Sequence, residues 1–128
     1  MANHVYLRGG KSCAEYRRLF MTSAADTQLL NELDWLSVRA AQMVARIHER
    51  LNDTEPAPPE FNMLMFLSSE RELRDRLEEA RKAAERLRAP SASEHEEQRS
   101  RDALVIRKAI LAIELQVARL AGMLEALL

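Results

Sequence analysis

The stretch LVIRKAILAIELQVARLAGMLEALL, residues 104–128, carries two separate sets of apolar residues. The first set repeats at alternating spacings of four and three residues, and its members are Ile106, Ile110, Ile113, Val117, Leu120, Leu124 and Leu127. On an α-helix these positions share one face, so each side chain can insert between side chains of a neighbouring helix. The stretch therefore predicts a helix that belongs to a bundle.

Two earlier stretches repeat the same spacing. The first contains Leu29, Leu33, Leu36, Ala40, Met43 and Ile47. The second contains Phe66, Leu73, Leu77, Ala80, Ala84 and Leu87, with Glu70 as an interruption. Pro56, Pro58, Pro59 and Pro90 separate the three stretches, because proline removes a backbone donor and clashes with the preceding helical turn. We therefore expect long helices over about 24–52, 61–88 and 94–127.

The fold class that follows is all-α. Ala, Leu, Arg, Glu and Lys make up more than half of the 128 residues, and aromatic residues only 5%, which is typical of long helices and argues against a sheet. Short linkers place consecutive helices antiparallel, so we predict one domain over residues 1–128, a three-helix bundle with coiled-coil-like packing. We expect a short additional helix near residues 13–21 and a flexible tail over residues 1–11.

Gly9-Gly10-Lys11-Ser12 resembles the end of a phosphate-binding loop, but the rest of that motif is missing. The loop requires a glycine five residues before Gly10, where this chain has Val5, and it must follow a buried strand. Ser12 and Glu15 instead form a capping box, in which each side chain satisfies a backbone donor at a helix start. The pattern favours a helix start over a nucleotide site.

Composition disfavours several other classes of protein. The formal net charge is −1 and no basic stripe stands out, so nucleic acid is a disfavoured partner. Cys13 is the single cysteine, and His4, His48 and His95 lie far apart, so we expect no metal site and no cofactor. The charges within residues 105–128 argue against a membrane span, and the first residues lack a signal-peptide pattern. We expect a reducing, cytoplasmic setting.

Acidic pairs at helical spacing suggest one enzymatic alternative. Some all-helical nucleotide pyrophosphohydrolases bind magnesium through carboxylates three residues apart, which point the same way. Glu72 with Asp75 and Glu94 with Glu97 have this spacing. The first pair is surrounded by arginines, and the second lies at an expected helix start, where carboxylates stabilise the helix dipole without metal. His48 has no evident carboxylate partner in the sequence, so we expect no catalytic residue.

The second apolar set in residues 104–128 lies almost opposite the first. Its members are Leu104, Leu111, Leu115 and Ala118, with Lys108 and Arg119 on one side and Arg107, Glu114 and Glu125 on the other. A helix with two opposed apolar faces needs neighbours on both sides, whereas a three-helix monomer offers an inward face only. We therefore predict a protein interface, in which either another protomer or a fourth helix of the same chain covers this face.

Two further features leave alternatives open. The segment Phe61–Leu67 is dense in apolar residues, and Met63 and Met65 belong either to a binding patch or to the core. Trp35 lies outside the repeat of the first long helix. Either residues Tyr16, Leu19 and Phe20 cover it, which is the favoured interpretation, or it is an exposed anchor for a partner.

The function that these features predict is protein–protein interaction, as an adaptor, a chaperone-like escort or a scaffold subunit. We expect a homo-oligomer, with a dimer favoured, and a further protein partner. The alternative function is a small metal-dependent nucleotide pyrophosphohydrolase that uses the acidic helical pairs.

Overall fold

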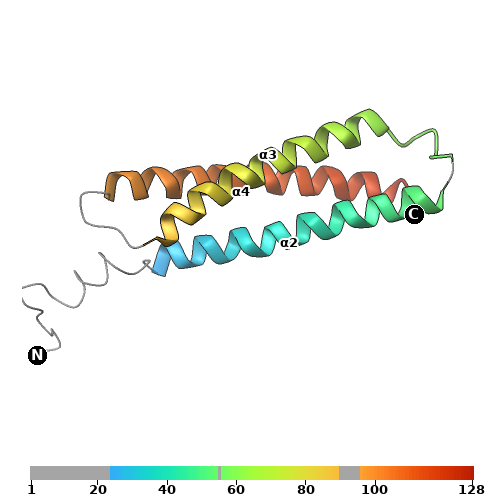
Figure 1. The fold of residues 1–128 in the computed structure, drawn as a ribbon. Coiled ribbons are helices and arrows are strands. Elements are labelled where there is room, and N and C mark those ends of the chain that lie inside the picture. Colours follow the sequence, from blue (N-terminus) through green and yellow to red (C-terminus); the bar gives the residue numbers. More distant parts are fainter. Residues whose placement is uncertain (1–23, 55, 90–95) are drawn as a thin grey trace, which may run out of the picture.

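A computed structural model describes residues 24–54, 56–89 and 96–128. Three helices form its fold: α2 (Ala24–Asp53), α3 (Met63–Arg88) and α4 (Glu96–Glu125) (Figure 1). The described residues contain no strand, which confirms the all-α prediction. The predicted helix near residues 13–21 and the predicted tail over residues 1–11 lie outside the described residues.

The helix ends differ from the predicted ones by a few residues, for local reasons. Asn62 caps α3, because its side-chain oxygen accepts a hydrogen bond from the Met65 backbone N–H at 2.9 Å, so the helix begins at Met63 and not at residue 61. At the other end, the N–H of Leu127 bonds the Leu124 carbonyl at 2.9 Å, a tighter turn that ends α4 at Glu125.

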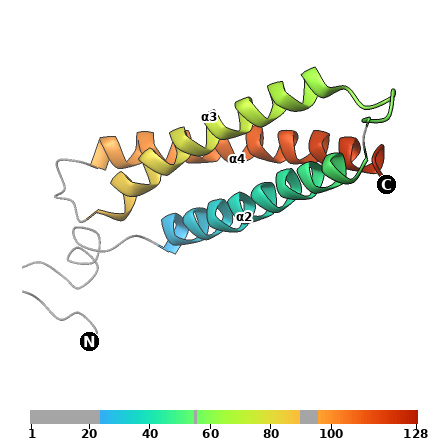
Figure 2. The same ribbon diagram turned by 45° about the vertical axis from the view of Figure 1, so that its right-hand side comes forward.

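The helices run up, down and up, so α2 and α4 point the same way. Helix α4 packs along both α2 and α3, whereas α2 and α3 contact each other at few positions. Two views related by 45° show α3 crossing α4 at an angle (Figures 1 and 2). The bundle is therefore closed on both sides of α4 and more open between α2 and α3.

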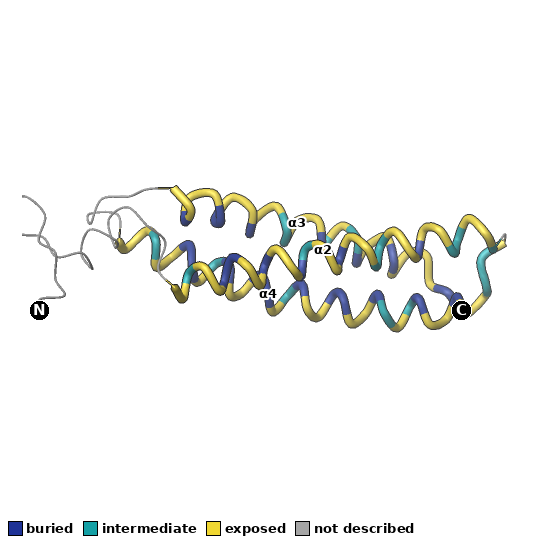
Figure 3. The backbone as a smooth tube through the Cα atoms, turned by 90° about the horizontal axis from the view of Figure 1, so that it is seen from below, coloured by how far each residue is buried: buried dark blue, intermediate teal, exposed yellow. Residues whose placement is uncertain are grey.

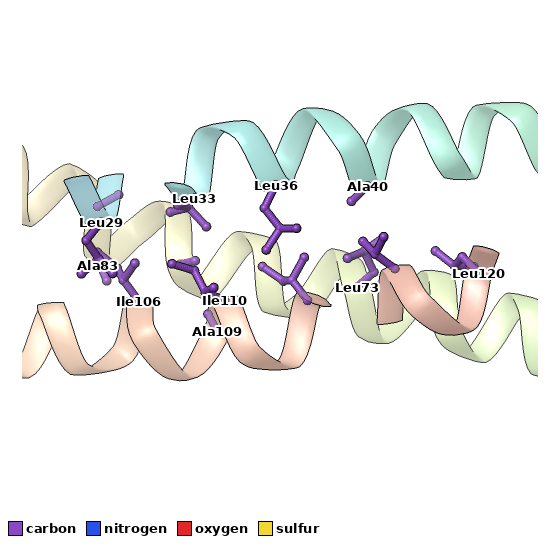
Figure 4. Packing of buried hydrophobic residues seen from close by; sticks show 14 of the residues in the cluster. Leu29, Leu33, Leu36, Ala40, Leu73, Ala83, Ile106, Ala109, Ile110 and Leu120 are labelled. Carbon is purple, nitrogen blue, oxygen red and sulfur yellow. The ribbon is translucent and has the colours of Figure 1, made fainter. Parts of the chain in front are cut away.

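The predicted repeats form the core. All seven members of the α4 repeat are buried, as are most members of the other two repeats (Figures 3 and 4). Met43 and Leu77 are the exceptions, because they lie at the edge of the core and are only partly buried. The repeat therefore predicts both the helices and the faces by which they pack.

One buried charge joins α3 to α4. The Asp102 side chain is 2% exposed and accepts hydrogen bonds from Arg86 Nε at 3.0 Å and from Gln98 Nε2 at 3.2 Å. The hydrogen bond to Asp102 raises the pKa of the Arg86 guanidinium above its ordinary value. A buried carboxylate requires such partners, so this contact fixes how α3 and α4 align.

Candidate interaction surface

The outward face of α4 carries a row of exposed apolar residues, which we call the outer stripe: Leu104, Leu111, Leu115 and Ala118. Leu104 is 48% exposed, Leu111 69% and Leu115 53%. Ala118 is also exposed. The row exists because residues three, four and seven apart share a helix face, and this face points away from α2 and α3. The structure therefore leaves all four predicted interface residues of α4 open to solvent.

Charged side chains border the outer stripe on both sides. Lys108 and Arg119 lie along one border and Arg107, Glu114 and Glu125 along the other, and all five are exposed. Gly122 continues the row toward the end of α4, and a Cβ built on it would meet no atom within 4 Å. An apolar row between charged borders is the pattern of a coiled-coil contact surface.

Trp35 lies next to the outer stripe, on α2. A shallow pocket of about 470 Å³ between α2 and α4 is lined by Trp35, Arg39, Ala118 and Ala121, among others. The Arg39 guanidinium carbon lies 5.6 Å from the centroid of the indole ring, within range of a cation–π contact. Trp35 is 63% exposed among the described residues, and its burial beneath a short N-terminal helix stays a prediction. Residues Tyr16, Leu19 and Phe20, its expected cover, lie outside the described residues.

The Phe61–Leu67 segment divides between core and surface. Phe61 and Phe66 are buried, and their rings lie 5.9 Å apart. The other apolar members form an exposed methionine patch: Met63 at 40%, Leu64 at 80%, Met65 at 53% and Leu67 at 48%. Phe61 and Phe66 therefore belong to the core, whereas Met63 and Met65 face solvent, and their role as a binding patch stays a prediction.

A groove of about 660 Å³ separates α2 from α3. Its apolar lining comes from Ala41, Val44 and Ala45 of α2 and from Leu73 and Leu77 of α3; the charged lining, from α3, is Glu70, Arg74, Asp75, Glu78 and Arg81. A hydrogen bond to Arg81 holds the pKa of the Glu78 carboxyl below its ordinary value. Because its carboxylates all come from α3, the groove does not bring acidic residues of two helices together.

His48 has a carboxylate partner that the sequence did not reveal. Its Nε2 lies 2.9 Å from Glu70 Oε2, and its ring packs edge-on against Phe66 with centroids 5.2 Å apart. The two residues are 22 positions apart on different helices, so their contact depends on how α2 and α3 align. This pair also explains the interruption of the α3 repeat at Glu70: the carboxylate faces a histidine of α2.

One carboxylate of each acidic pair in the enzymatic alternative bonds an arginine of its own helix. Glu72 bonds Arg76 at 3.1 Å, and Glu97 bonds Arg101 at 3.1 Å. Glu94 lies outside the described residues, as do Gly9–Ser12. Over residues 24–54, 56–89 and 96–128, no three His, Cys, Asp or Glu side chains are grouped so that they could hold a metal ion.

Comparison with known proteins gives no relative from which a function could be transferred. The chain matches no family model, no curated protein and no solved structure. Within the part of the chain that the structure describes, no helix is long and apolar enough to cross a membrane. A functional proposal for this protein therefore depends on its own surface.

Proposed function

We propose that this protein is a non-catalytic interaction module, an adaptor, chaperone-like escort or scaffold subunit, which assembles as a homo-oligomer through the outer stripe of α4. The observation that carries this proposal is the exposure of Leu104, Leu111 and Leu115 in one row, opposite the core face of the same helix. Single exposed leucines are ordinary on protein surfaces, whereas several leucines on one helix face with charged borders are typical of a contact site.

The energetics of a dimer are consistent with this surface. Burying one leucine side chain is worth about 1.5–3 kcal/mol, and a two-fold axis buries the same three leucines on both subunits. Association costs roughly 4–15 kcal/mol in lost translational and rotational freedom. Six leucines are thus of the right order to support a dimer, and a larger assembly is not required to cover the row.

The methionine patch is the proposed site for a different protein. Met63 and Met65 lie at the start of α3, at the end of the bundle where the chain terminates (Figure 1). Methionine side chains are flexible and polarisable, so they adapt to irregular partner surfaces. A dimer formed through α4 leaves this patch free.

Sedimentation equilibrium of the full chain tests the proposal. We expect a dimer at micromolar concentration, and we expect Leu111→Glu to raise the dissociation constant by about 100-fold or more, because it places a carboxylate in the contact twice by symmetry. Val38→Glu is the matched control, since Val38 is 57% exposed on α2. It should leave the mass of the dimer unchanged.

A wild-type monomer at tens of micromolar would contradict the homo-oligomer. A dimer that Leu111→Glu and Val38→Glu weaken equally would show that the contact lies elsewhere. Circular dichroism of both variants should show unchanged helix content. A lower molecular mass in sedimentation then reflects dissociation of the dimer and not unfolding.

A further inference from the structure

We propose that the occupant of the outer stripe is a second copy of this chain in antiparallel orientation, with the two-fold axis at residue 113. This inference rests on the proposed function and adds the direction and register of the contact. In this register, residue i of one copy lies opposite residue 226 − i of the other. The pairing follows from the residues along the row, taken position by position.

Two of the border residues, Lys108 and Glu125, fall on the same alternating spacing as the outer stripe, as do Arg101 and Gly122. At alternating spacings of three and four, the outward positions of α4 are Arg101, Leu104, Lys108, Leu111, Leu115, Ala118, Gly122 and Glu125. All eight are exposed. The row is therefore basic toward the start of α4, aliphatic in its middle and acidic at its end.

A parallel dimer would place each of these residues opposite itself. Arg101 would face Arg101, Lys108 would face Lys108, and Glu125 would face Glu125, which makes three layers of like charge. Like charges that face each other across a helix pair are destabilising, and in a coiled coil they select against that orientation. Charge thus opposes the parallel arrangement at three of the eight outward positions.

The antiparallel register removes all three like-charge layers. Arg101 faces Glu125 of the second copy, and Glu125 faces Arg101 in return. Lys108 faces Ala118, over which its long aliphatic stem can lie while its ammonium group reaches solvent. At the centre, Leu111 faces Leu115 twice.

Side-chain size agrees with the same register. Leu104 faces Gly122 of the second copy, and the space outside Gly122 is open. A large side chain opposite a glycine lets the two helices approach closely. A shift of one heptad in one direction would place Lys108 opposite Leu111, and a shift in the other direction would place Leu104 opposite position 129, past the end of α4 at Glu125. The register centred on residue 113 avoids both.

Disulfide cross-linking between single-cysteine proteins tests this pairing. Cys13→Ser removes the native thiol, and Leu104→Cys or Gly122→Cys then supplies one thiol in the outer stripe. The two proteins, one of which carries a tag that changes its mass, are mixed, refolded together from urea and oxidised. A disulfide requires Cα atoms within about 7 Å, whereas residues 104 and 122 of parallel copies would be roughly 27 Å apart along the axis.

We expect the mixture to form the disulfide between residues 104 and 122 at least about tenfold faster than either protein forms a disulfide alone. In the antiparallel register, two copies of residue 104, or two copies of residue 122, are themselves roughly 27 Å apart. In a parallel dimer the result would be the reverse, because each protein would cross-link to itself. The reverse result would overturn the antiparallel register while the homo-oligomer stands.

The sedimentation behaviour of the same proteins separates failure of this inference from failure of the proposed function. A dimer that yields no disulfide in any of the three samples would overturn the outer-stripe register. A monomer in all samples would overturn the proposed homo-oligomer, and this inference with it.

Discussion

The inner and outer faces of α4 carry similar side chains in opposite surroundings. On the inner face, Ile106, Ile113 and Leu120 are completely buried against α2 and α3. On the outer face, Leu104, Leu111 and Leu115 are about half exposed or more. Both faces repeat at the same spacing, so the periodicity of the helix does not distinguish a core contact from an assembly contact. The difference arises because, among the described residues, α4 has helical neighbours on its inner face alone.

The α3–α4 contact is closely packed, whereas the α2–α3 contact is open. Between α3 and α4, small and aliphatic residues pack closely around the Asp102 ion pair. Between α2 and α3 there is a groove lined in part by Glu70, which pairs with the half-exposed His48 of α2. Stability should therefore reside mainly along α4, which contacts both partners.

The largest expected effect comes from the inner face of α4. Ile113→Ala should lower the free energy of unfolding by about 2–5 kcal/mol, because it removes buried methyl groups and leaves a cavity. Urea denaturation at several protein concentrations measures this loss, which should appear at all of them. Leu111→Ala is the comparison: its cost should vanish on dilution, as the dimer dissociates. Equal losses for the two variants at low concentration would mean that Leu111 is buried within the monomer.

The next effect separates a buried ion pair from an exposed one. Asp102→Ala should cost about 1–3 kcal/mol, because it removes a buried acceptor from Arg86 and Gln98. Asp34→Ala is the control, since Asp34 is 64% exposed and bonds Arg88 at 3.2 Å. Its cost should stay below about 0.5 kcal/mol. Similar costs for both variants would contradict the role of Asp102 in aligning α3 with α4.

The direction of the Arg86 pKa shift determines how Arg86 contributes to the pH dependence of the free energy of unfolding. A raised pKa for a basic group stabilises the fold at every pH below its ordinary value, and the stabilisation is lost only as the pH rises through the raised value. Both values for a guanidinium lie far above neutrality. Arg86 should therefore add no slope to the stability of the wild-type protein between about pH 5 and 9.

The fold was predictable to a large extent, because the apolar repeat determines both the helices and their packed faces. The start of α3 was less predictable, since the Asn62 cap, and not apolar periodicity, sets it. The contacts of His48 with Glu70 and of Arg86 with Asp102 were not predictable. They join residues of different helices, and their formation depends on an axial alignment that the repeat leaves free in steps of a heptad.

The surface shows the same limit. The exposure of the outer stripe follows from counting faces: the three described helices leave the second apolar face of α4 without a neighbour among the described residues. The exposure of Trp35 among the described residues did not follow from its residue type, because burial is only an average tendency of tryptophan. The apolar pattern of the sequence predicts where an interaction surface lies, whereas charge and shape along that surface determine which partner binds it.

The smallest effect concerns Gln116. Whereas Leu111 is an apolar residue on the exposed side of α4, Gln116 is a polar residue on its buried side. Its side chain is 5% exposed, and among the described residues nothing donates a hydrogen bond to its Oε1. A buried acceptor without a donor costs free energy, and methionine has nearly the same length as glutamine and no hydrogen-bonding amide. Gln116→Met should therefore raise the free energy of unfolding by about 1 kcal/mol, measured by urea denaturation. Gln42→Met, at an exposed position of α2, should change it by less than about 0.5 kcal/mol. If Gln116→Met instead lowered the free energy of unfolding, the Gln116 amide would stabilise the core along α4, and the expected cost of its unpaired oxygen would be contradicted.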